Sequence, residues 1–221
     1  MAFVQKQDQE IIQTGSSDPQ PSFKVRAMVP FSRTAFGPSG GSFETDPLTL
    51  MNIGLTDTFT ASIRVDYAPQ GWTIGFRDQG GTLHTDPTDF GLSGDASTTF
   101  NAVVTPSSPG YARFALIVNS TNLVRPLEIP FTYITDDVGT LIIDDDGGEN
   151  FEDYFTAPLE AAGLPYGVWD RGASALTTEV AQACDLLIWN AGWAFPTLDA
   201  DDKLFLADYL DSGKALFMSG Q

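Results

Sequence analysis

The residues most able to do chemistry form an acidic loop, Asp144-Asp-Asp-Gly-Gly-Glu-Asn150, which directly follows an apolar stretch. Such a stretch predicts a strand of a parallel sheet, and ligands of these sheets bind at the carboxyl ends of the strands. Adjacent carboxylates repel each other unless water or a cation relieves the repulsion. A hard cation such as Mg²⁺ or Ca²⁺ suits oxygen ligands. We therefore name Asp144 and Asp145 as candidate metal ligands.

The acidic loop also has a plainer interpretation, which we take as the default. Its negative charge would stabilise the positively polarised start of the helix that follows, while water solvates the turn. The spacing is not that of an EF-hand, whose acids stand at alternate positions before a glycine. Nor is it a phosphate-binding loop, because it lacks lysine and its acids would oppose an anion. Ca²⁺ or Mg²⁺ is thus the only cofactor that we name.

Residues for covalent or acid–base catalysis are few. The chain has one cysteine, Cys184, and one histidine, His84. These counts exclude an internal disulfide and a cysteine-only zinc site, and they argue against an ordinary Ser-His-Asp triad. We expect both residues to be packing or surface residues. Ser219 could act as a nucleophile only with a base from beyond residue 221, so we name no catalytic residue.

The charge balance limits the partners. Acidic residues outnumber basic ones by 29 to 11, and the net charge is −18 over 221 residues. We expect no nucleic-acid partner and no anionic membrane partner, because both need clustered lysine and arginine. No apolar run reaches the length of a membrane span, and no signal segment follows Met1. Residues 38–125 nevertheless have the lysine-poor, threonine- and serine-rich composition of exported β domains, so we expect a secreted or cell-surface protein.

The first two parts of the chain are a tail and a β domain. Residues 1–22 predict a strand at 2–5, a helical turn at 10–13 and a linker at 14–21. Residues 23–135 predict an antiparallel β-sandwich, because short alternating segments are separated by turn clusters. Pro130 falls on the outward phase of its segment and predicts an edge strand. The predicted strands cover residues 23–28, 48–53, 57–67, 72–76, 98–104, 112–118 and 127–133.

Residues 139–221 change to alternating strands and helices, which predicts right-handed crossovers and a parallel sheet. The predicted strands are 139–143, 166–169, 186–189 and 214–220. The predicted helices follow Asn150, lie near 178–183 and run from about Asp199 to Asp211. The last of these should bury Phe205, Leu206, Tyr209 and Leu210.

Local signals set the ends of the first helix. We expect Asn150 to cap it, with Asp153 at the reciprocal position of a capping box. Pro158 should kink or split the helix, and Gly163 fits the left-handed residue after its end.

The final predicted strand, 214–220, has no helix after it to cover its apolar residues. We therefore expect an incomplete α/β domain in a piece of a longer protein. We also expect the polypeptide to be prone to aggregation, because that strand leaves apolar surface open.

The segment Ala68-Pro-Gln-Gly-Trp-Thr-Ile-Gly-Phe76 resembles the Pro-x-Gly-Trp turns of bacterial Ig-like and fibronectin type III-like extracellular modules. This resemblance covers roughly residues 40–135 and implies a β-sandwich. We expect Trp72 to fill the core rather than to form a sugar platform.

Three resemblances concern residues 139–221. Leu141-Ile-Ile-Asp-Asp145 resembles the acidic pocket of receiver domains, and the family's phosphoryl acceptor would then fall on Asn190, which cannot form an acyl phosphate. The helix and strand that end in Met218-Ser-Gly-Gln221 resemble the class I glutamine amidotransferase-like fold, a Rossmann-like α/β architecture, but its nucleophilic cysteine is absent near Gly220. The set of motifs also resembles modules of large secreted bacterial proteins, which implies an accessory role.

The sequence as a whole predicts a multidomain chain, an Ig-like β-sandwich followed by a truncated three-layer α/β domain of amidotransferase-like or flavodoxin-like type. The predicted function is that of a non-catalytic structural or interaction segment of a large secreted or cell-surface bacterial protein. Its partners would be other domains of the same parent chain and a protein or glycan at the cell surface. The alternatives are part of a hydrolase, a peptidase or amidotransferase-like enzyme whose catalytic residues lie beyond residue 221, and a divalent-cation-binding module.

Overall fold

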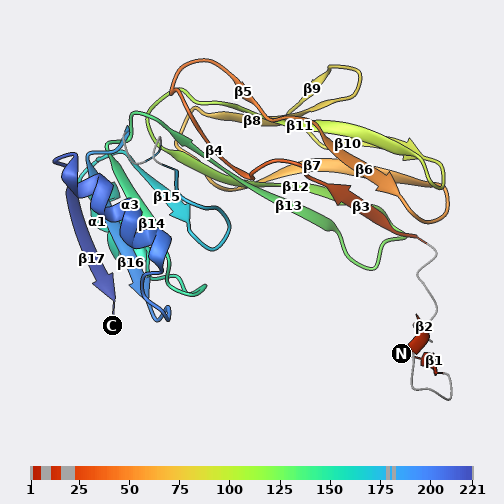
Figure 1. The fold of residues 1–221 in the computed structure, drawn as a ribbon. Helices are drawn as coiled ribbons and strands as arrows, with labels where there is room; N and C mark the ends of the chain where they lie inside the picture. The colour runs from red at the N-terminus through yellow and green to blue at the C-terminus, as the bar shows by residue number, and fades with distance from the viewer. Residues whose placement is uncertain (1, 6–10, 16–22, 178–179, 181–182, 221) are drawn as a thin grey trace.

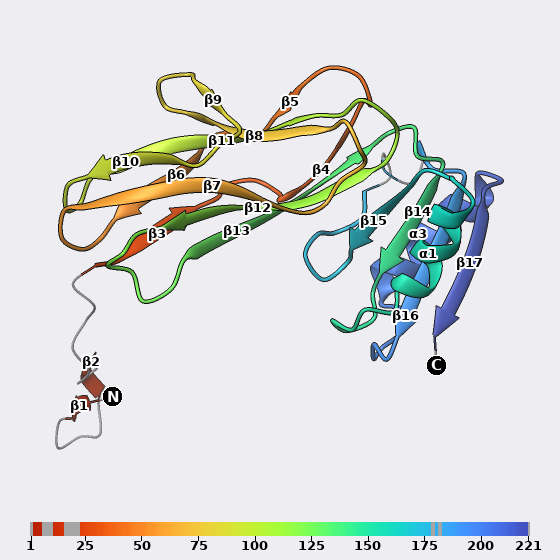
Figure 2. The same cartoon turned by 180° about the vertical axis from the view of Figure 1, so that it is seen from behind.

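The computed structural model describes residues 2–5, 11–15, 23–177, 180 and 183–220. Figure 1 shows a β-sandwich beside a smaller unit that is built on a parallel sheet, and Figure 2 shows both from behind. The predicted linker and the predicted helix near 178–183 fall largely outside the described residues. Within the described parts, none of the helices combines the length and the apolar character that crossing a membrane requires.

A hairpin near the N-terminus consists of β1 (Ala2–Gln5) and β2 (Ile11–Gly15), which pair antiparallel. The strand predicted at 2–5 is confirmed. The helical turn predicted at 10–13 is wrong from residue 11 onward, because Ile11 and Ile12 are β-branched and lie in β2, where Ile11 pairs with Gln5 and Gln13 with Val4.

The sandwich consists of two sheets. The first has the order β10-β7-β12-β13-β4, and the second has the order β3-β6-β11-β8-β9 with β5 paired to β11. The strands of the first sheet are β4 (Thr34–Gly37), β7 (Asp57–Tyr67), β10 (Thr88–Leu92), β12 (Tyr111–Asn119) and β13 (Leu127–Thr135). The strands of the second are β3 (Val25–Met28), β5 (Phe43–Glu44), β6 (Leu48–Asn52), β8 (Thr73–Asp78), β9 (Leu83–His84) and β11 (Ser97–Thr105).

Alternating side chains explain the sandwich core. Phe59 and Ala61 of β7 and Phe114 and Leu116 of β12 are buried, as period-two patterning predicts. Trp72 packs against this core edge-on to Tyr133, and its Nε1–H donates to Ser108 Oγ. The prediction of a β-sandwich is therefore confirmed, and Trp72 contributes to its core.

Two predicted details of the sandwich are wrong. The sheets are not wholly antiparallel, because β4 pairs parallel with β13. Nor is β13 an edge strand, since it lies between β12 and β4. The signal of Pro130 has a local explanation: β4 pairs with β13 only from Thr132 to Thr135, so Pro130 lies where β13 has a single neighbour.

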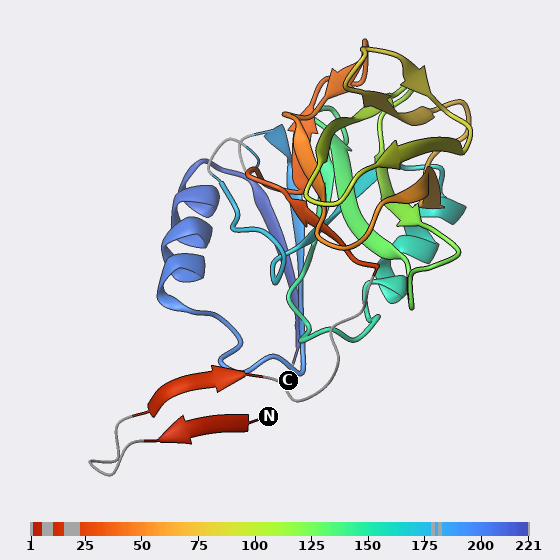
Figure 3. The same cartoon turned by 90° about the vertical axis from the view of Figure 1, so that its right-hand side faces the viewer.

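The smaller unit holds a four-stranded parallel sheet in the order β15-β14-β16-β17. Its strands are β14 (Thr140–Asp144), β15 (Tyr166–Asp170), β16 (Leu186–Gly192) and β17 (Ala215–Gly220). Helix α1 (Asp153–Ala161) lies on one side of the sheet and α3 (Ala200–Asp211) on the other, as Figure 3 shows. The predicted parallel sheet is therefore present.

Several predictions about the helices need correction. Residue Glu152 precedes α1 without a side-chain cap, so Asn150 and Asp153 form no capping box. Pro158 lies within α1 and does not split it. Gly163 does have the expected positive φ, 65°. In α3, Leu206 and Tyr209 are buried as predicted and Phe205 is partly buried, but Leu210 is 46% exposed.

The sandwich and the parallel sheet share apolar contacts. Tyr67 and Tyr111 of the sandwich stack with their ring centroids 4.5 Å apart, and Tyr166 of β15 lies 5.4 Å from Tyr111. Ile134 of β13 is fully buried and belongs to the core of the parallel-sheet unit. The hydroxyl of Tyr166 donates to Glu160 at 2.6 Å. The two predicted regions, 23–135 and 139–221, therefore meet through side chains that both units bury.

Candidate functional site

The strand order places the acidic loop at the switch point of the parallel sheet. The chain leaves β14 toward β15 on one side and later returns to β16 on the other, and ligands of open α/β sheets bind at such a point. Asp144 ends β14 and pairs with Asn190 of β16 in the parallel register. The carboxyl ends of these two strands therefore hold the acidic loop.

Three acids gather there, and we call Asp144, Asp146 and Glu152 the carboxylate cluster. Each offers an oxygen, and these oxygens all lie within 4.8 Å of one another. They come from the end of β14, from the loop after it and from the residue before α1. This spacing lets all three reach one cation.

The side chain of Asp146 organises the loop. Its Oδ1 accepts hydrogen bonds from the backbone N–H groups of Gly148 and Glu149, at 3.0 and 2.9 Å. Its Oδ2 accepts from the N–H of Phe151 at 3.1 Å and from Asn190 Nδ2 at 3.4 Å. The loop can wrap around this carboxylate because Gly148 has a φ of 94°, which L side chains rarely adopt.

Glu152 is the unusual member of the cluster. The residue is 6% exposed, and its Oε2 is buried without a hydrogen-bond partner among the described residues. Its Oε1 lies 3.8 Å from Nη1 of Arg113, which comes from β12 of the sandwich. Burial raises the pKa of Glu152 above its ordinary value. A buried carboxylate oxygen normally has a partner, so this one is available to a ligand.

The pKa of Asp144 is raised by the same burial and the neighbouring carboxylates. Burial, and then the charges of Glu152 and Asp146, raise its pKa to about 7. At neutral pH the cluster is therefore partly protonated. A divalent cation would replace those protons and relieve the repulsion.

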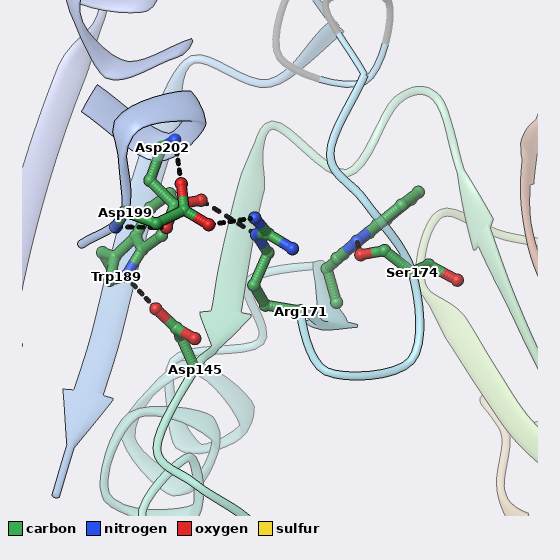
Figure 4. Close-up of polar contacts among 7 residues, drawn as sticks. Asp145, Arg171, Ser174, Trp189, Asp199 and Asp202 are labelled. Carbon is green, nitrogen blue, oxygen red and sulfur yellow. Dashed lines mark hydrogen bonds and ion pairs between the residues drawn. The ribbon is translucent and has the colours of Figure 1, made fainter. Parts of the chain in front are cut away.

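The other predicted ligand, Asp145, lies on the opposite face of the sheet. Its Oδ2 accepts a hydrogen bond from Trp189 Nε1 at 3.1 Å, as Figure 4 shows. Nearby, Arg171 forms ion pairs with Asp199 and Asp202 at the start of α3. Burial raises the pKa of Asp145, while the hydrogen bond from Trp189 opposes the rise.

Strand alternation explains this separation. Successive residues of an extended chain point to opposite faces, so Asp144 points to the α1 side and Asp145 to the α3 side. Of the two predicted ligands, the structure brings only Asp144 into the cluster. Asp146 belonged to the acidic run in the sequence and had the right phase. Glu152 had no sequence signal, because it looked like an ordinary residue at the start of a helix.

A cavity of about 500 Å³ adjoins the carboxylate cluster, and we call it the aromatic cavity. Asn190 and Ser219 contribute polar groups to its lining, at the ends of β16 and β17. Its aromatic walls are Phe151, Tyr154, Phe155 and Trp193.

A second polar constellation surrounds His84 in the sandwich. His84 Nε2 lies 2.8 Å from Asp78 Oδ2, and its Nδ1 lies 3.0 Å from Thr88 Oγ1. No sequence pattern predicted this hydroxyl–imidazole–carboxylate chain. The imidazole stacks on Phe76 with a centroid distance of 5.1 Å, and Thr88 Oγ1 also donates to the Asp86 carbonyl. These contacts hold the loop after β8 in place, and we assign the chain a structural role.

The remaining candidates from the sequence are Cys184, Ser219 and Asn190. Cys184 is fully buried, and burial raises the pKa of its thiol to about 11. The reactive thiolate is therefore disfavoured at neutral pH. Ser219 pairs with Asn190 in the sheet and lines the aromatic cavity. Asn190, the position of the receiver-type phosphoryl acceptor, does lie beside the cluster as an amide.

Comparisons with known proteins leave the family open. No protein-family model matches the chain, and no curated protein matches it. Similar solved structures include a PapD-like domain of human CEP192 (14% identity, TM-score 0.33), covering 56% of this chain and 91% of that one. They also include a member of the MSP family of C. elegans (8%, 0.31; 52% and 99%) and a CARDB domain from Pyrococcus furiosus (14%, 0.34; 53% and 97%). Likenesses this low carry no argument about function, and the description as a β-sandwich rests on the strand pairing itself.

Proposed function

We propose that this chain is a non-catalytic module that binds one divalent cation at the carboxylate cluster. The observation that carries the proposal is the buried, unpartnered Oε2 of Glu152 beside Asp144 and Asp146. Leaving such an oxygen without a partner destabilises the fold, whereas a cation would satisfy it. Carboxylate oxygens favour Ca²⁺ or Mg²⁺ over softer metals.

The cation would have a structural role. Its three ligands come from β14, from the loop and from the start of α1, and Glu152 also approaches Arg113 of the sandwich. A bound ion would therefore fix the acidic loop and support the junction of the two units. This suits a structural or interaction segment of a larger secreted or cell-surface bacterial protein, with other domains of that protein as its partners.

The hydrolase alternative has less support. Cys184 is buried away from the carboxyl edge of the sheet, and Ser219 has no imidazole beside it among the described residues. The parallel sheet resembles amidotransferase-like folds in the order of its strands and helices. We propose this likeness for the architecture and not for the activity.

Calorimetric and thermal titrations with Ca²⁺ and with Mg²⁺ test the proposal. The full chain is first stripped with EDTA and then compared with Glu152→Gln and with Glu149→Gln, an exposed acid of the same loop. We expect wild type and Glu149→Gln to bind one equivalent. At a hundredfold excess over Kd, their Tm should rise by roughly 5–10 °C. Glu152→Gln should show neither heat nor shift. If wild type gives no heat at millimolar metal, the proposal is wrong.

A further inference from the structure

The aromatic cavity is shaped for a ligand with an apolar face. Two of its aromatic residues are accessible from solvent, since Trp193 is 62% exposed and Tyr154 is 75% exposed. Rings in such positions offer a flat apolar surface to a ligand that enters from outside. The volume, about 500 Å³, falls within the range of small-molecule sites.

The charge around the cavity narrows the class of ligand. Among the described residues, the side chains that line it are all uncharged. The neighbouring cluster holds three carboxylates, so an anion such as a phosphate ester would be repelled. A divalent cation in the cluster would cancel most of the carboxylate charge, so an organic cation would gain little attraction there. A neutral ligand avoids the repulsion.

Residues of the cavity wall contact the carboxylate cluster. Asn190 lines the cavity and donates to Asp146, and the backbone N–H of Phe151 donates to Asp146 while its ring forms part of the wall. Gly192 of the cavity wall packs directly against Asp146, because a Cβ there would lie 2.5 Å from Asp146 Cβ and 2.9 Å from Phe151 Cδ2. A ligand in the cavity therefore lies next to the proposed ion.

From these observations we infer that the aromatic cavity binds a neutral saccharide. One face of a sugar ring would lie against Trp193, and its hydroxyl groups would reach Asn190, Ser219 and the bound cation. A hard cation accepts hydroxyl oxygens as ligands in place of water. This inference rests on the proposed cation site, because the ion supplies one of the polar contacts.

The test begins with Ca²⁺ calorimetry on the full chain, so that the ion site is judged separately. The Ca²⁺-loaded protein is then titrated with methyl α-mannoside, methyl β-galactoside, N-acetylglucosamine and cellobiose, by calorimetry and saturation-transfer NMR. We expect at least one sugar to bind, with affinity about tenfold weaker in EDTA and about tenfold weaker in Trp193→Ala, as loss of one good ring contact implies. Phe195→Ala is the matched control, because Phe195 is 97% exposed and lies outside the cavity lining.

The outcomes separate the two proposals. If Ca²⁺ binds and no sugar of the panel does, the saccharide inference is overturned and the cation site stands. If Ca²⁺ fails to bind, the Ca²⁺-dependent saccharide site is overturned, and if Mg²⁺ fails as well, the proposed function falls with it. Equal sugar affinity in wild type and Trp193→Ala would also overturn the inference. So would binding of choline in EDTA without binding of any sugar.

Discussion

At the scale of single residues, the chain buries acids where an apolar core would be more stable. Glu152 keeps one oxygen without a partner, and Asp144 lies beside it with its pKa raised to about 7. Proteins keep costly arrangements of this kind mainly where they serve function. The local backbone is built to hold them, because Asp146 binds three N–H groups of its own loop.

Asp144→Asn should stabilise the metal-free protein, and increasingly so as the pH rises. The carboxyl has an ordinary pKa of 3.8 and a folded pKa of about 7, so the folded state holds a proton that the unfolded chain loses. That contribution to stability is fully present below pH 3.8 and is lost as the pH rises through about 7. Asparagine cannot ionise and avoids the loss.

Thermal unfolding in EDTA, followed by circular dichroism from acid to mildly alkaline pH, measures this difference. The Tm of Asp144→Asn should exceed that of wild type most clearly above neutrality. Glu149→Gln serves as the control, because Glu149 is exposed in the same loop. A Tm difference that is constant with pH would contradict the assigned pKa.

At the scale of elements, β17 is the exposed edge of the parallel sheet. Among the described residues it pairs with β16 alone, and its Phe217 and Met218 are 53% and 44% exposed. Phe217 still meets Phe155 of α1, at a centroid distance of 5.9 Å. A long edge strand that carries apolar side chains is a template for association with other chains.

Met218→Lys should therefore reduce self-association, because a charge on an edge strand discourages edge-to-edge pairing. Its effect on the free energy of unfolding should stay within about 0.5 kcal/mol, as for most exposed positions. Light scattering and size-exclusion chromatography over a range of concentrations measure the change. The control is Leu204→Lys on α3, where the leucine is 67% exposed. If wild type is monodisperse at every concentration, β17 does not drive association.

At the scale of the whole molecule, the sandwich and the parallel sheet share buried contacts, so we expect one unfolding transition. Ile134 ends β13 of the sandwich and lies in the core of the other unit. Gly167 of β15 makes room for it: a Cβ on this glycine would lie 2.5 Å from Ile134 Cγ2 and 3.0 Å from Leu141 Cδ1. The absence of a side chain at Gly167 thus permits the two units to meet.

Gly167→Ala should destabilise the protein by about 1–3 kcal/mol, the usual cost of overpacking a core. Scanning calorimetry should show the single transition of wild type lowered or split in two, since the parallel-sheet unit would lose its fit to the sandwich. Gly91→Ala in β10 is the matched control, because a Cβ there meets nothing within 4 Å. Two separate transitions in wild type itself would show that the shared contacts do not couple the units.

Much of the architecture was predictable from local pattern. The alternation at 57–67 predicted β7 to the residue, and the helix predicted from about Asp199 to Asp211 matches α3, for which the structure adds Asp199 as the N-cap. The continuous apolar runs predicted the strands of the parallel sheet. Hydrophobic periods of 2 and 3.6 residues depend only on near neighbours in the chain, so they can be recognised without knowledge of the tertiary contacts. The proposed truncation and the domain boundaries stay predictions.

The candidate site depended on contacts that no local pattern contains. The acidic run was visible, but the pairing of β14 with β16 and the side of the sheet that α1 covers place Asp144 with Glu152 and direct Asp145 toward Trp189. The same holds for β4, whose four residues form a strand because β13 offers a parallel partner far along the chain. Sequence period tells which residues share a face. Long-range packing decides which distant residues that face contacts, because buried area and charge interactions arise between segments that are far apart in the sequence.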